Sequence, residues 1–173
     1  EKKFFGGSSV EFTEARRITN LPMLRKDFII DEYQIIESKS IGADAILLIA
    51  ACLNSSQIKN LSKLAKSFDL EVLIEIHDLE ELNKVCIDSI DIIGINNRNL
   101  KTFDVNIETS LNLVEKIPSS FTKISESGLN NPSEIMKLKN SGFDGFLIGE
   151  RFMRNSNPGE ELSNFISKIK NES

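Results

Sequence analysis

The stretch SESG at residues 125–128 and the stretch LIGE at residues 147–150 decide the fold class of this 173-residue chain. In each, a short apolar run leads to a glycine, Gly128 or Gly149, whose missing Cβ lets the backbone come close to an anion. Two such turns on neighbouring parallel strands, each opening a helix, form a phosphate site from backbone N–H groups and helix N-termini. In a (β/α)8 barrel that site follows strands 7 and 8, so the two stretches predict the end of such a barrel.

Outward from these turns, short apolar runs recur along the chain, with helical segments between them. Most runs are near-continuous, as in strands buried on both faces of a parallel sheet, and the β-α alternation predicts such a sheet. No G-x-G-x-x-G or G-x-x-x-x-G-K-S/T stretch occurs, which favours a barrel over a nucleotide-binding open sheet. The predicted strands cover residues 22–28, 45–50, 71–76, 90–96, 121–126 and 144–149, and the predicted helices cover residues 32–41, 55–67 and 78–86, with another beginning at Asn130-Asn131-Pro132.

The length and composition are those of one ordinary domain covering residues 1–173, with 40% hydrophobic and 27% charged residues. The net charge of −5 argues against nucleic acid as the main partner. No apolar run approaches the roughly 20 residues that cross a bilayer, so no membrane partner is expected. Cys52 and Cys86 lie far apart among apolar residues, which predicts buried free thiols and a cytoplasmic protein. A single histidine, His77, excludes a multi-histidine metal site within the chain.

Two charged side chains near the ends of predicted strands are the main candidates for chemistry, because strand C-termini form the mouth of a barrel. Leu24, Lys26 and Phe28 lie two positions apart and so share one face of the predicted strand. If that face is the barrel interior, Lys26 points into the mouth, where a desolvated lysine can act as an acid. A solvated surface lysine is the alternative. Glu75 lies within the apolar run VLIEI, where a charge is costly to bury unless it is paired. This position favours an acid or base over an outward-pointing charge.

Asn96, Glu126 and two phenylalanines are weaker candidates. Asn96 could orient substrate hydroxyls, but asparagine is also common in turns. Glu126 precedes the SESG glycine, where a carboxylate could equally stabilise the start of a helix. Phe5 and Phe28 could pack on a planar ring, although core packing is the commoner role of phenylalanine. The helix-to-strand turns IGAD, residues 41–44, and SGFD, residues 141–144, resemble each other, as stacked βα units would.

Taken together, LRKDF at residues 24–28, GINNRNL at residues 94–100, SESG and LIGE resemble the indole-3-glycerol-phosphate synthase family, a family of (β/α)8 barrels. LRKDF and GINNRNL are specific to that family, whereas SESG and LIGE are shared with other phosphate-binding barrels. The resemblance extends from Lys2 to the last helix through LPMLRKDFIIDEYQI, GADAILLI, VLIEIHD, IIGINNRNLKTF, SESG and FLIGERFMR, in that order.

The resemblance implies a substrate and a reaction in tryptophan biosynthesis. The substrate would be 1-(2-carboxyphenylamino)-1-deoxyribulose 5-phosphate, whose indole ring closes with loss of carbon dioxide and water, without a metal or organic cofactor. Lys26 would be the general acid for attack on the sugar carbonyl, and Glu75 the acid or base of the dehydration. The remaining implied roles are sugar and anthranilate contacts from Asn96 and Glu126, phosphate contacts from Ser127, Gly128, Gly149 and Glu150, and apolar walls from Phe5, Phe28, Leu47 and Leu147.

The chain departs from the family pattern at two places. Position 150 is glutamate where some relatives have a small hydroxyl residue, so we expect a backbone N–H to contact the phosphate while the Glu150 carboxylate points outward. No segment matches the family's first barrel strand, with its Glu-x-Lys pair and Ser-Pro-Ser turn. Six strands cannot close such a barrel. We therefore expect strands 3 to 8 of an incomplete barrel that is inactive or nearly so alone. Its partners would be the missing N-terminal strands or another tryptophan-pathway domain of the parent protein.

Two other functions stay open at this point. One is another phosphate-binding TIM-barrel enzyme, such as phosphoribosylanthranilate isomerase or a thiazole-forming synthase. The isomerase would need a Cys/Asp pair at strand ends, and the positions of Cys52 and Cys86 disfavour it. The other is a non-catalytic half-barrel that binds a phosphorylated ligand.

Overall fold

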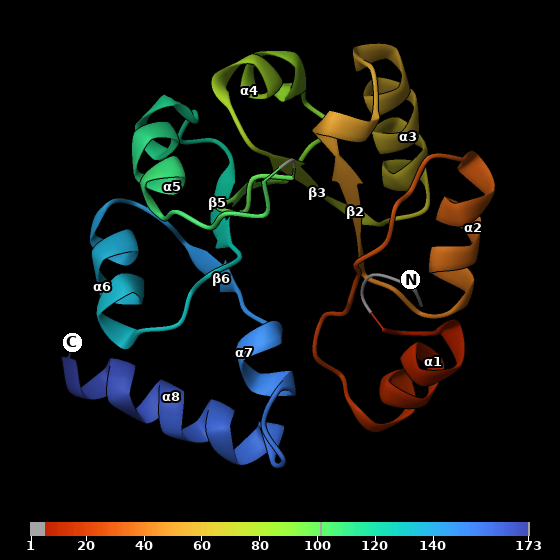
Figure 1. The fold of residues 1–173 in the computed structure, drawn as a ribbon. Coiled ribbons are helices and arrows are strands. Elements are labelled where there is room, and N and C mark those ends of the chain that lie inside the picture. Colours follow the sequence, from red (N-terminus) through yellow and green to blue (C-terminus); the bar gives the residue numbers. More distant parts are fainter. Residues whose placement is uncertain (1–5, 101, 173) are drawn as a thin grey trace. The chain divides into compact units, whose positions relative to one another are not determined.

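The computed structural model describes residues 6–100 and 102–172, in which strands and helices alternate along the chain (Figure 1). This alternation confirms the predicted α/β organisation. Contacts within the chain define two compact units. The first comprises residues 1–76 and 80–92, and the second comprises residues 77–79 and 93–173.

The first unit is built on parallel strands, with β1 next to β2 and β2 next to β3. Helix α3 packs against β2 and β3 and buries Ile58, Leu61 and Ala65 at helical spacing along one face. Helix α2 lies beside α3. The elements are α1 (Ser9–Ile18), β1 (Leu24–Arg25), α2 (Glu32–Ser40), β2 (Ala45–Ile49), the 3-10 turn η1 (Ala50–Cys52), α3 (Ser55–Ser67), β3 (Glu71–Ile76) and α4 (Leu79–Val85), whose first residue belongs to the second unit.

The register of β2 and β3 decides which side chains share a face of the sheet. Leu47 pairs with Leu73, and Ile49 pairs with Glu75. Paired residues lie on the same face, and so do residues two positions apart in one strand. Leu47 and Glu75 therefore lie on one face of these strands. Leu47 is fully buried.

Strand β1 is much shorter than the predicted strand at residues 22–28. It covers only Leu24–Arg25. Just beyond the strand, a carboxylate oxygen of Asp27 accepts the N–H of Phe28 at 2.7 Å, a local contact that competes with ladder hydrogen bonds. Before the strand, a carboxylate oxygen of Asp44 accepts the N–H of Met23 at 2.7 Å.

Helix α1 has no counterpart among the predicted helices. It begins after Ser8, whose Oγ accepts the N–H of Glu11 at 3.2 Å. None of its residues is buried, so it lacks the buried apolar stripe by which a helix is recognised in a sequence. The serine followed three positions later by glutamate is the one local signal that marks its start.

The second unit contains β4, β5 and β6, with β4 next to β5 and β5 parallel to β6. Helices α6 and α7 pack against α8 (Figure 1). There the rings of Phe152 and Phe165 meet edge to face at 5.6 Å, with the Arg151 guanidinium 4.6 Å from the Phe165 ring centre. The elements are β4 (Ile92–Asn96), whose first residue belongs to the first unit, α5 (Glu108–Leu113), the 3-10 turn η2 (Val114–Lys116), β5 (Thr122–Glu126), α6 (Pro132–Asn140), β6 (Gly145–Leu147), α7 (Glu150–Met153) and α8 (Pro158–Glu172).

An aspartate just before a strand recurs as a structural device in both units. Asp44 accepts the N–H of Met23, as described above, and donates its own N–H to the Met23 carbonyl at 2.9 Å. Asp144 makes the same reciprocal pair with Lys123, at 2.8 Å in both directions. Asp91 does so with Val72, at 2.8 and 3.1 Å. The likeness of the turns at residues 41–44 and 141–144 therefore has a common function, which is to hold the start of one strand to the start of the preceding one.

The prediction that Cys52 and Cys86 are buried is wrong. Both are free thiols, as predicted, but both are exposed. Cys52 ends η1, and Cys86 follows the last residue of α4. In both places the apolar neighbours Leu53 and Val85 take the inward positions, which leaves the cysteines facing outward.

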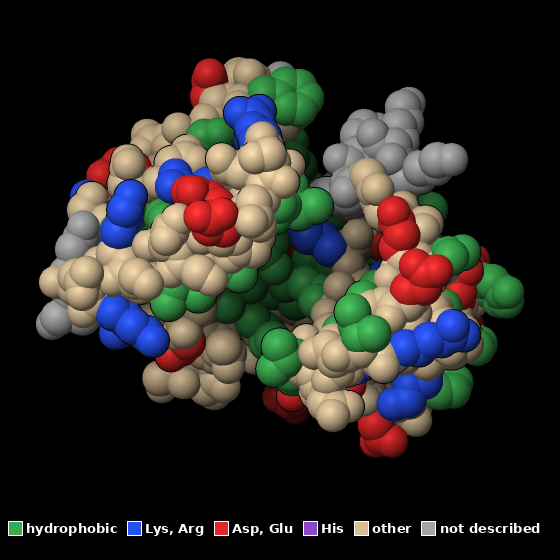
Figure 2. Space-filling model, turned by 90° about the horizontal axis from the view of Figure 1, so that it is seen from below, with side chains coloured by type: hydrophobic (Ala, Val, Ile, Leu, Met, Phe, Trp, Pro, Cys, Tyr) green, Lys and Arg blue, Asp and Glu red, His purple; other side chains and the backbone are tan. Residues whose placement is uncertain are grey.

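The molecular surface carries both kinds of charge. On the face drawn in Figure 2, Lys and Arg side chains are interspersed with Asp and Glu side chains, and hydrophobic side chains lie among them. Several large apolar residues are exposed, among them Ile18, Leu21 and Met153. Within the described ranges, no helix combines the length and apolarity needed to cross a membrane.

Candidate functional site

Lys26 and Glu75 form an ion pair in the first unit. The Nζ atom of Lys26 lies 3.2 Å from Oε2 of Glu75. Glu75 is only 3% exposed, although it lies in an apolar strand. A buried carboxylate needs compensation by a cation or by hydrogen bonds, and the Lys26 ammonium supplies part of it. The structure thus brings together the two residues that the sequence marked as the strongest candidates.

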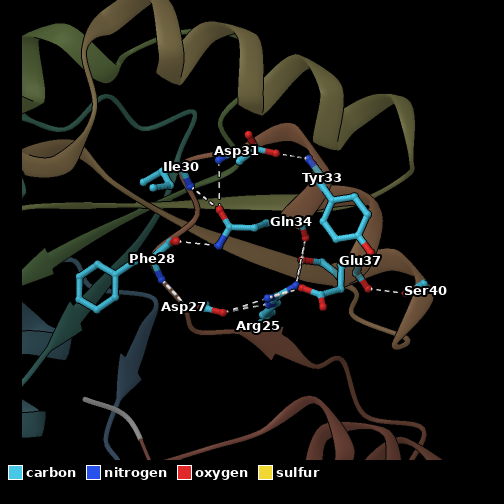
Figure 3. A network of polar contacts seen from close by, with 10 residues as sticks. Arg25, Asp27, Phe28, Ile30, Asp31, Tyr33, Gln34, Glu37 and Ser40 are labelled. Carbon is cyan, nitrogen blue, oxygen red and sulfur yellow. Dashed lines mark hydrogen bonds and ion pairs between the residues drawn. The ribbon is translucent and has the colours of Figure 1, made fainter. Parts of the chain in front are cut away.

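Of the two residues that flank Lys26, Arg25 is held by α2 and Asp27 is held by Arg25 (Figure 3). A single Arg25 nitrogen, Nη2, lies 3.0 Å from an Asp27 oxygen and 2.7 Å from a Glu37 oxygen. The other terminal nitrogen of Arg25 donates to the carbonyl of Gln34 at 3.1 Å. Arg25 and Asp27 thus contact each other, whereas Lys26 between them contacts Glu75 of β3.

The segment that carries Phe28 is held by the amide of Gln34. Nε2 of Gln34 donates to the Phe28 carbonyl at 2.9 Å, and its Oε1 accepts the N–H groups of Ile30 at 2.8 Å and Asp31 at 3.1 Å. Asp31 in turn caps α2 by accepting the N–H of Tyr33 at 2.8 Å. In Figure 3 the half-buried ring of Phe28 points away from Gln34 and α2.

Three charged side chains act on the Cys52 thiol near the end of β2. The pKa of the Cys52 thiol is raised, first by partial burial of the thiol and then by the charges of Glu75 and Glu81, while Lys84 acts in the opposite direction. Lys84 also donates to the carbonyls of Ala50 at 2.5 Å and Leu53 at 3.1 Å and so holds the turn after β2.

In the second unit, the two asparagines at the end of β4 differ in what they bind. Oδ1 of Asn96 accepts the N–H of Arg98 at 2.9 Å, a turn contact of the kind the sequence left open. Asn97 is 2% exposed and donates to Ser125 Oγ at 3.0 Å and to the Ser127 carbonyl at 3.2 Å. Sequence reasoning did not select Asn97, because adjacent asparagines carry the same local signal.

Glu126 ends β5 and is 1% exposed. It pairs with Leu147 of β6 in the strand register, so these two candidate residues lie on one face. Helix α6 does not begin until Pro132, so Glu126 is not in the first turn of a helix and the helix-dipole explanation for it does not apply. Glu126 is therefore a buried carboxylate at the end of a strand.

The turn after β5 requires glycine at position 128. Ser127 and Gly128 both have positive φ, at 68° and 71°. A Cβ on Gly128 would lie 1.9 Å from Cγ1 of Val105, so no larger residue fits. The expectation that this turn opens a helix directly is wrong, since residues 129–131 separate Gly128 from α6.

Gly149, by contrast, immediately precedes α7, as expected for the second turn. Its φ is −121°, and among the described residues no atom lies within 4 Å of the place where a Cβ would be. Neither φ nor packing against those residues calls for glycine here. A ligand that approaches the backbone closely would provide a reason.

Glu150 is exposed and pairs with two arginines. Its Oε2 lies 2.8 Å from Nη2 of Arg98, and its Oε1 pairs with Arg154. The two guanidinium groups offset the negative charge of the Glu150 carboxylate. The contact with Arg98 joins residues 52 positions apart, and no sequence signal announces it.

The residues predicted to form apolar walls differ in burial. Leu47 is fully buried, Phe28 and Leu147 are half-buried, and Phe5 lies outside the described residues. Within the part of the chain that the structure describes, no group of three or more His, Cys, Asp or Glu residues could hold a metal ion.

Comparison with protein families and curated proteins gives a consistent result. The family model described as "Indole-3-glycerol phosphate synthase" matches residues 1–165. The protein of that name from Bacteroides thetaiotaomicron is 48% identical over 169 residues, which is 98% of this chain and 65% of the relative. Its namesake from Campylobacter fetus is 49% identical over 172 residues, which is 99% of this chain and 65% of the relative. The chain therefore spans about 65% of the length of these relatives.

Solved structures show the same fold at low sequence identity. A mutant tryptophan synthase alpha-subunit from Pyrococcus furiosus matches with a TM-score of 0.73 at 16% sequence identity. The match covers 94% of this chain and 72% of the alpha-subunit. The 3-hexulose-6-phosphate synthase from Salmonella typhimurium matches with a TM-score of 0.76 at 11% sequence identity. This match covers 94% of this chain and 80% of the synthase chain. These structures are TIM barrels, so the predicted α/β fold of that class is confirmed.

Proposed function

Because the chain belongs to the indole-3-glycerol phosphate synthase family, we propose that this chain, as part of a complete barrel, converts 1-(2-carboxyphenylamino)-1-deoxyribulose 5-phosphate into indole-3-glycerol phosphate. The contact that carries the proposal is the 3.2 Å pair of Lys26 and Glu75, with the carboxylate buried in an apolar strand. An ammonium and a carboxylate held this closely can give and take protons at one centre.

In the proposed first step, Lys26 is the acid. The ring carbon that bears the carboxylate bonds to the carbonyl carbon of the sugar, and the carbonyl oxygen takes a proton from the Lys26 ammonium. Carbon dioxide then leaves, and its bonding electrons restore the aromatic ring. Glu75 orients the ammonium for the attack. Arg25 and Asp27 support this role because their own contacts bind them to α2 and to each other.

In the proposed second step, the hydroxyl formed by ring closure leaves as water. Departure of the hydroxyl needs a proton, and formation of the indole double bond releases one. Glu75 exchanges these protons as acid and base. Its burial supports this role, because a carboxylate away from bulk water can hold or release a proton in place.

The second unit supplies the proposed contacts to the rest of the substrate. Asn96 and Glu126 would bind the sugar hydroxyls and the anthranilate group. Backbone N–H groups of Ser127, Gly128, Gly149 and Glu150 would bind the phosphate, and binding there would orient the reacting carbons. The Arg98 and Arg154 partners of Glu150 support a phosphate at this turn. Phe28, Leu47 and Leu147, with Phe5, would form the apolar walls.

As the family resemblance implies, the protein would use no metal or organic cofactor. It would act in the cytoplasm, where its free thiols would stay reduced.

Turnover by a joined protein tests the proposal. The chain is fused to the part of the Bacteroides thetaiotaomicron relative that it does not match, because it covers 65% of that relative. Indole fluorescence then follows conversion of the carboxyphenylamino-deoxyribulose phosphate. Lys26→Met should lower kcat by about 10²- to 10⁴-fold and leave inhibition by inorganic phosphate unchanged.

Lys66→Met is the matched control, because Lys66 also forms an ion pair in the first unit, with Asp91 at 2.7 Å. It should retain the turnover of the parent protein. If the joined protein formed no indole product, or if Lys26→Met retained full turnover, the proposed role would be wrong.

A further inference from the structure

The side-chain amide of Asn97 lies at the centre of a buried hydrogen-bond network in the second unit. As well as its bonds to Ser125 and Ser127, its Oδ1 accepts the N–H of Ser110 at 3.2 Å. The hydroxyls of Ser110 and Ser125 are 2.7 Å apart. Asn97 is 2% exposed, and both of these serines are fully buried. One amide therefore ties together the end of β4, the turn after β5 and the helix α5.

The backbone of Asn97 strengthens the same connection. Its N–H donates to the Glu126 carbonyl at 2.9 Å, and its own carbonyl accepts the N–H of Asn106 at 3.0 Å. The loop between Asn97 and Asn106 returns in this way against the turn after β5. Val105 in that loop fills the space where a side chain on Gly128 would lie. The turn is thus held through its carbonyl groups and by packing.

Ser127 is the residue in the turn that most needs such support. A residue with a Cβ rarely adopts positive φ and does so only where its surroundings impose it. Ser127 has a φ of 68°, and the Asn97 amide donates directly to its carbonyl oxygen at 3.2 Å. This contact fixes the peptide plane that joins Ser127 to Gly128, and with it the direction of the Gly128 N–H.

We propose that Asn97 is a positioning residue for phosphate binding, acting through Ser125 and the Ser127 carbonyl on the N–H groups of the turn. The inference rests on the proposed function, which assigns the phosphate to this turn. Asn97 does not touch the phosphate in this scheme. It keeps the turn in the conformation that binds phosphate before the phosphate arrives, which lowers the cost of binding.

A titration of the 173-residue chain with inorganic phosphate tests the inference, with the amide NMR signals of Gly128 and Gly149 as the readout. In the parent chain both signals should shift and saturate. In Asn97→Ala the dissociation constant measured at Gly128 should rise about tenfold, and in Ser125→Ala about threefold, because buried hydrogen bonds that hold the turn are lost. The Gly128 signal of Asn97→Ala should also move in the absence of phosphate.

Ser62→Ala is the matched control. Ser62 is fully buried, and its hydroxyl lies 2.6 Å from that of Ser89, so it has the same kind of serine pair as Ser125 but in the first unit. Its loss of unfolding free energy should resemble that of Ser125→Ala, while its phosphate affinity should equal that of the parent chain. Reduced affinity in Ser125→Ala alone therefore reports positioning rather than general destabilisation.

The outcomes separate the inference from the function on which it rests. If phosphate shifts neither glycine signal in the parent chain, the phosphate assignment and the inference both fail. If the parent chain binds phosphate and both Asn97→Ala and Ser125→Ala bind it as tightly as the parent chain does, only the inference fails. Should Asn97→Ala not fold, the comparison of Ser125→Ala with Ser62→Ala decides between these results.

Discussion

The ammonium of Lys26 lies 3.2 Å from the carboxylate of Glu75, although 49 positions separate them in the chain. The two partners are unequally buried, since the Glu75 side chain is 4% exposed and that of Lys26 is 28% exposed. If the pair is broken, water can solvate the partly exposed Lys26 ammonium in place of the carboxylate. Water can solvate the buried Glu75 carboxylate much less, so Glu75 loses more stabilisation than Lys26 does. The pair is therefore asymmetric, and the two sides should respond differently to substitution.

We expect Lys26→Met to destabilise the chain more than Glu75→Gln does. The first change removes a cation from a buried carboxylate and should cost about 1–3 kcal/mol of unfolding free energy. In the second, the glutamine oxygen can still accept from Lys26, and the lysine keeps access to water, so the cost should be smaller. Urea unfolding of the two variants and the parent chain measures both values. A larger loss for Glu75→Gln would contradict the asymmetry.

The two glycines of the predicted phosphate turns should behave in opposite ways. Gly128→Ala should cost about 1–3 kcal/mol of stability, because φ is positive and Val105 occupies the Cβ position. Gly149→Ala should change stability by less than about 0.5 kcal/mol and yet weaken phosphate binding, since the methyl group would stand where a ligand approaches. Thermal unfolding and phosphate titration of both variants check this. Equal destabilisation by both would refute the distinction.

The exposed thiols provide a test of the electrostatics around Glu75. Burial and the charges of Glu75 and Glu81 raise the pKa of Cys52 above its ordinary value of 9.0, whereas burial alone raises the pKa of Cys86. Glu75→Gln removes one of the raising charges, so it should increase the thiolate fraction of Cys52 and speed its alkylation by iodoacetamide about twofold. Peptide mass spectrometry measures both rates in one sample, and the Cys86 rate should stay constant as the internal control.

Asp44 should make stability depend on pH in acid. The N–H of Met23 lowers the pKa of this carboxyl most, burial comes next and opposes it, and with the added effect of the Arg16 guanidinium the pKa lies below its ordinary value of 3.8. The unfolded chain therefore binds the proton more readily than the folded chain does. The stabilisation is fully present above about pH 3.8 and is lost as the pH falls through the lower pKa of the folded state.

Asp44→Asn should remove this part of the acid dependence, whereas removal of the exposed carboxylate in Asp88→Asn is the control. Thermal unfolding of both variants and the parent chain across the acid range provides the comparison. Identical pH profiles for Asp44→Asn and the parent chain would show that the Asp44 contacts do not contribute.

Much of the fold could be predicted because its signals are local. Helix α3 covers residues 55–67 as predicted, and β3 covers residues 71–76, since helical spacing and continuous apolar runs depend only on near neighbours. Strand β1 was predicted too long because nothing in the run of residues shows that the Asp27 side chain takes up the N–H of Phe28. The exposure of Cys52 was not predicted, because the apolar run around it does not show which of its residues point inward. Leu53 does so, and Cys52 faces outward.

The sequence by itself determined the α/β class, the positions of most strands and the residue types at their ends, including Lys26, Glu75 and Glu126. Apolar periodicity and a glycine at a turn express chemistry that acts over a few residues. Only the tertiary structure decided that Lys26 meets Glu75, that Asn97 rather than Asn96 holds the carbonyl of Ser127, and that Arg98 neutralises Glu150. These contacts join residues distant in the chain, and their geometry arises only when strands and loops pack together.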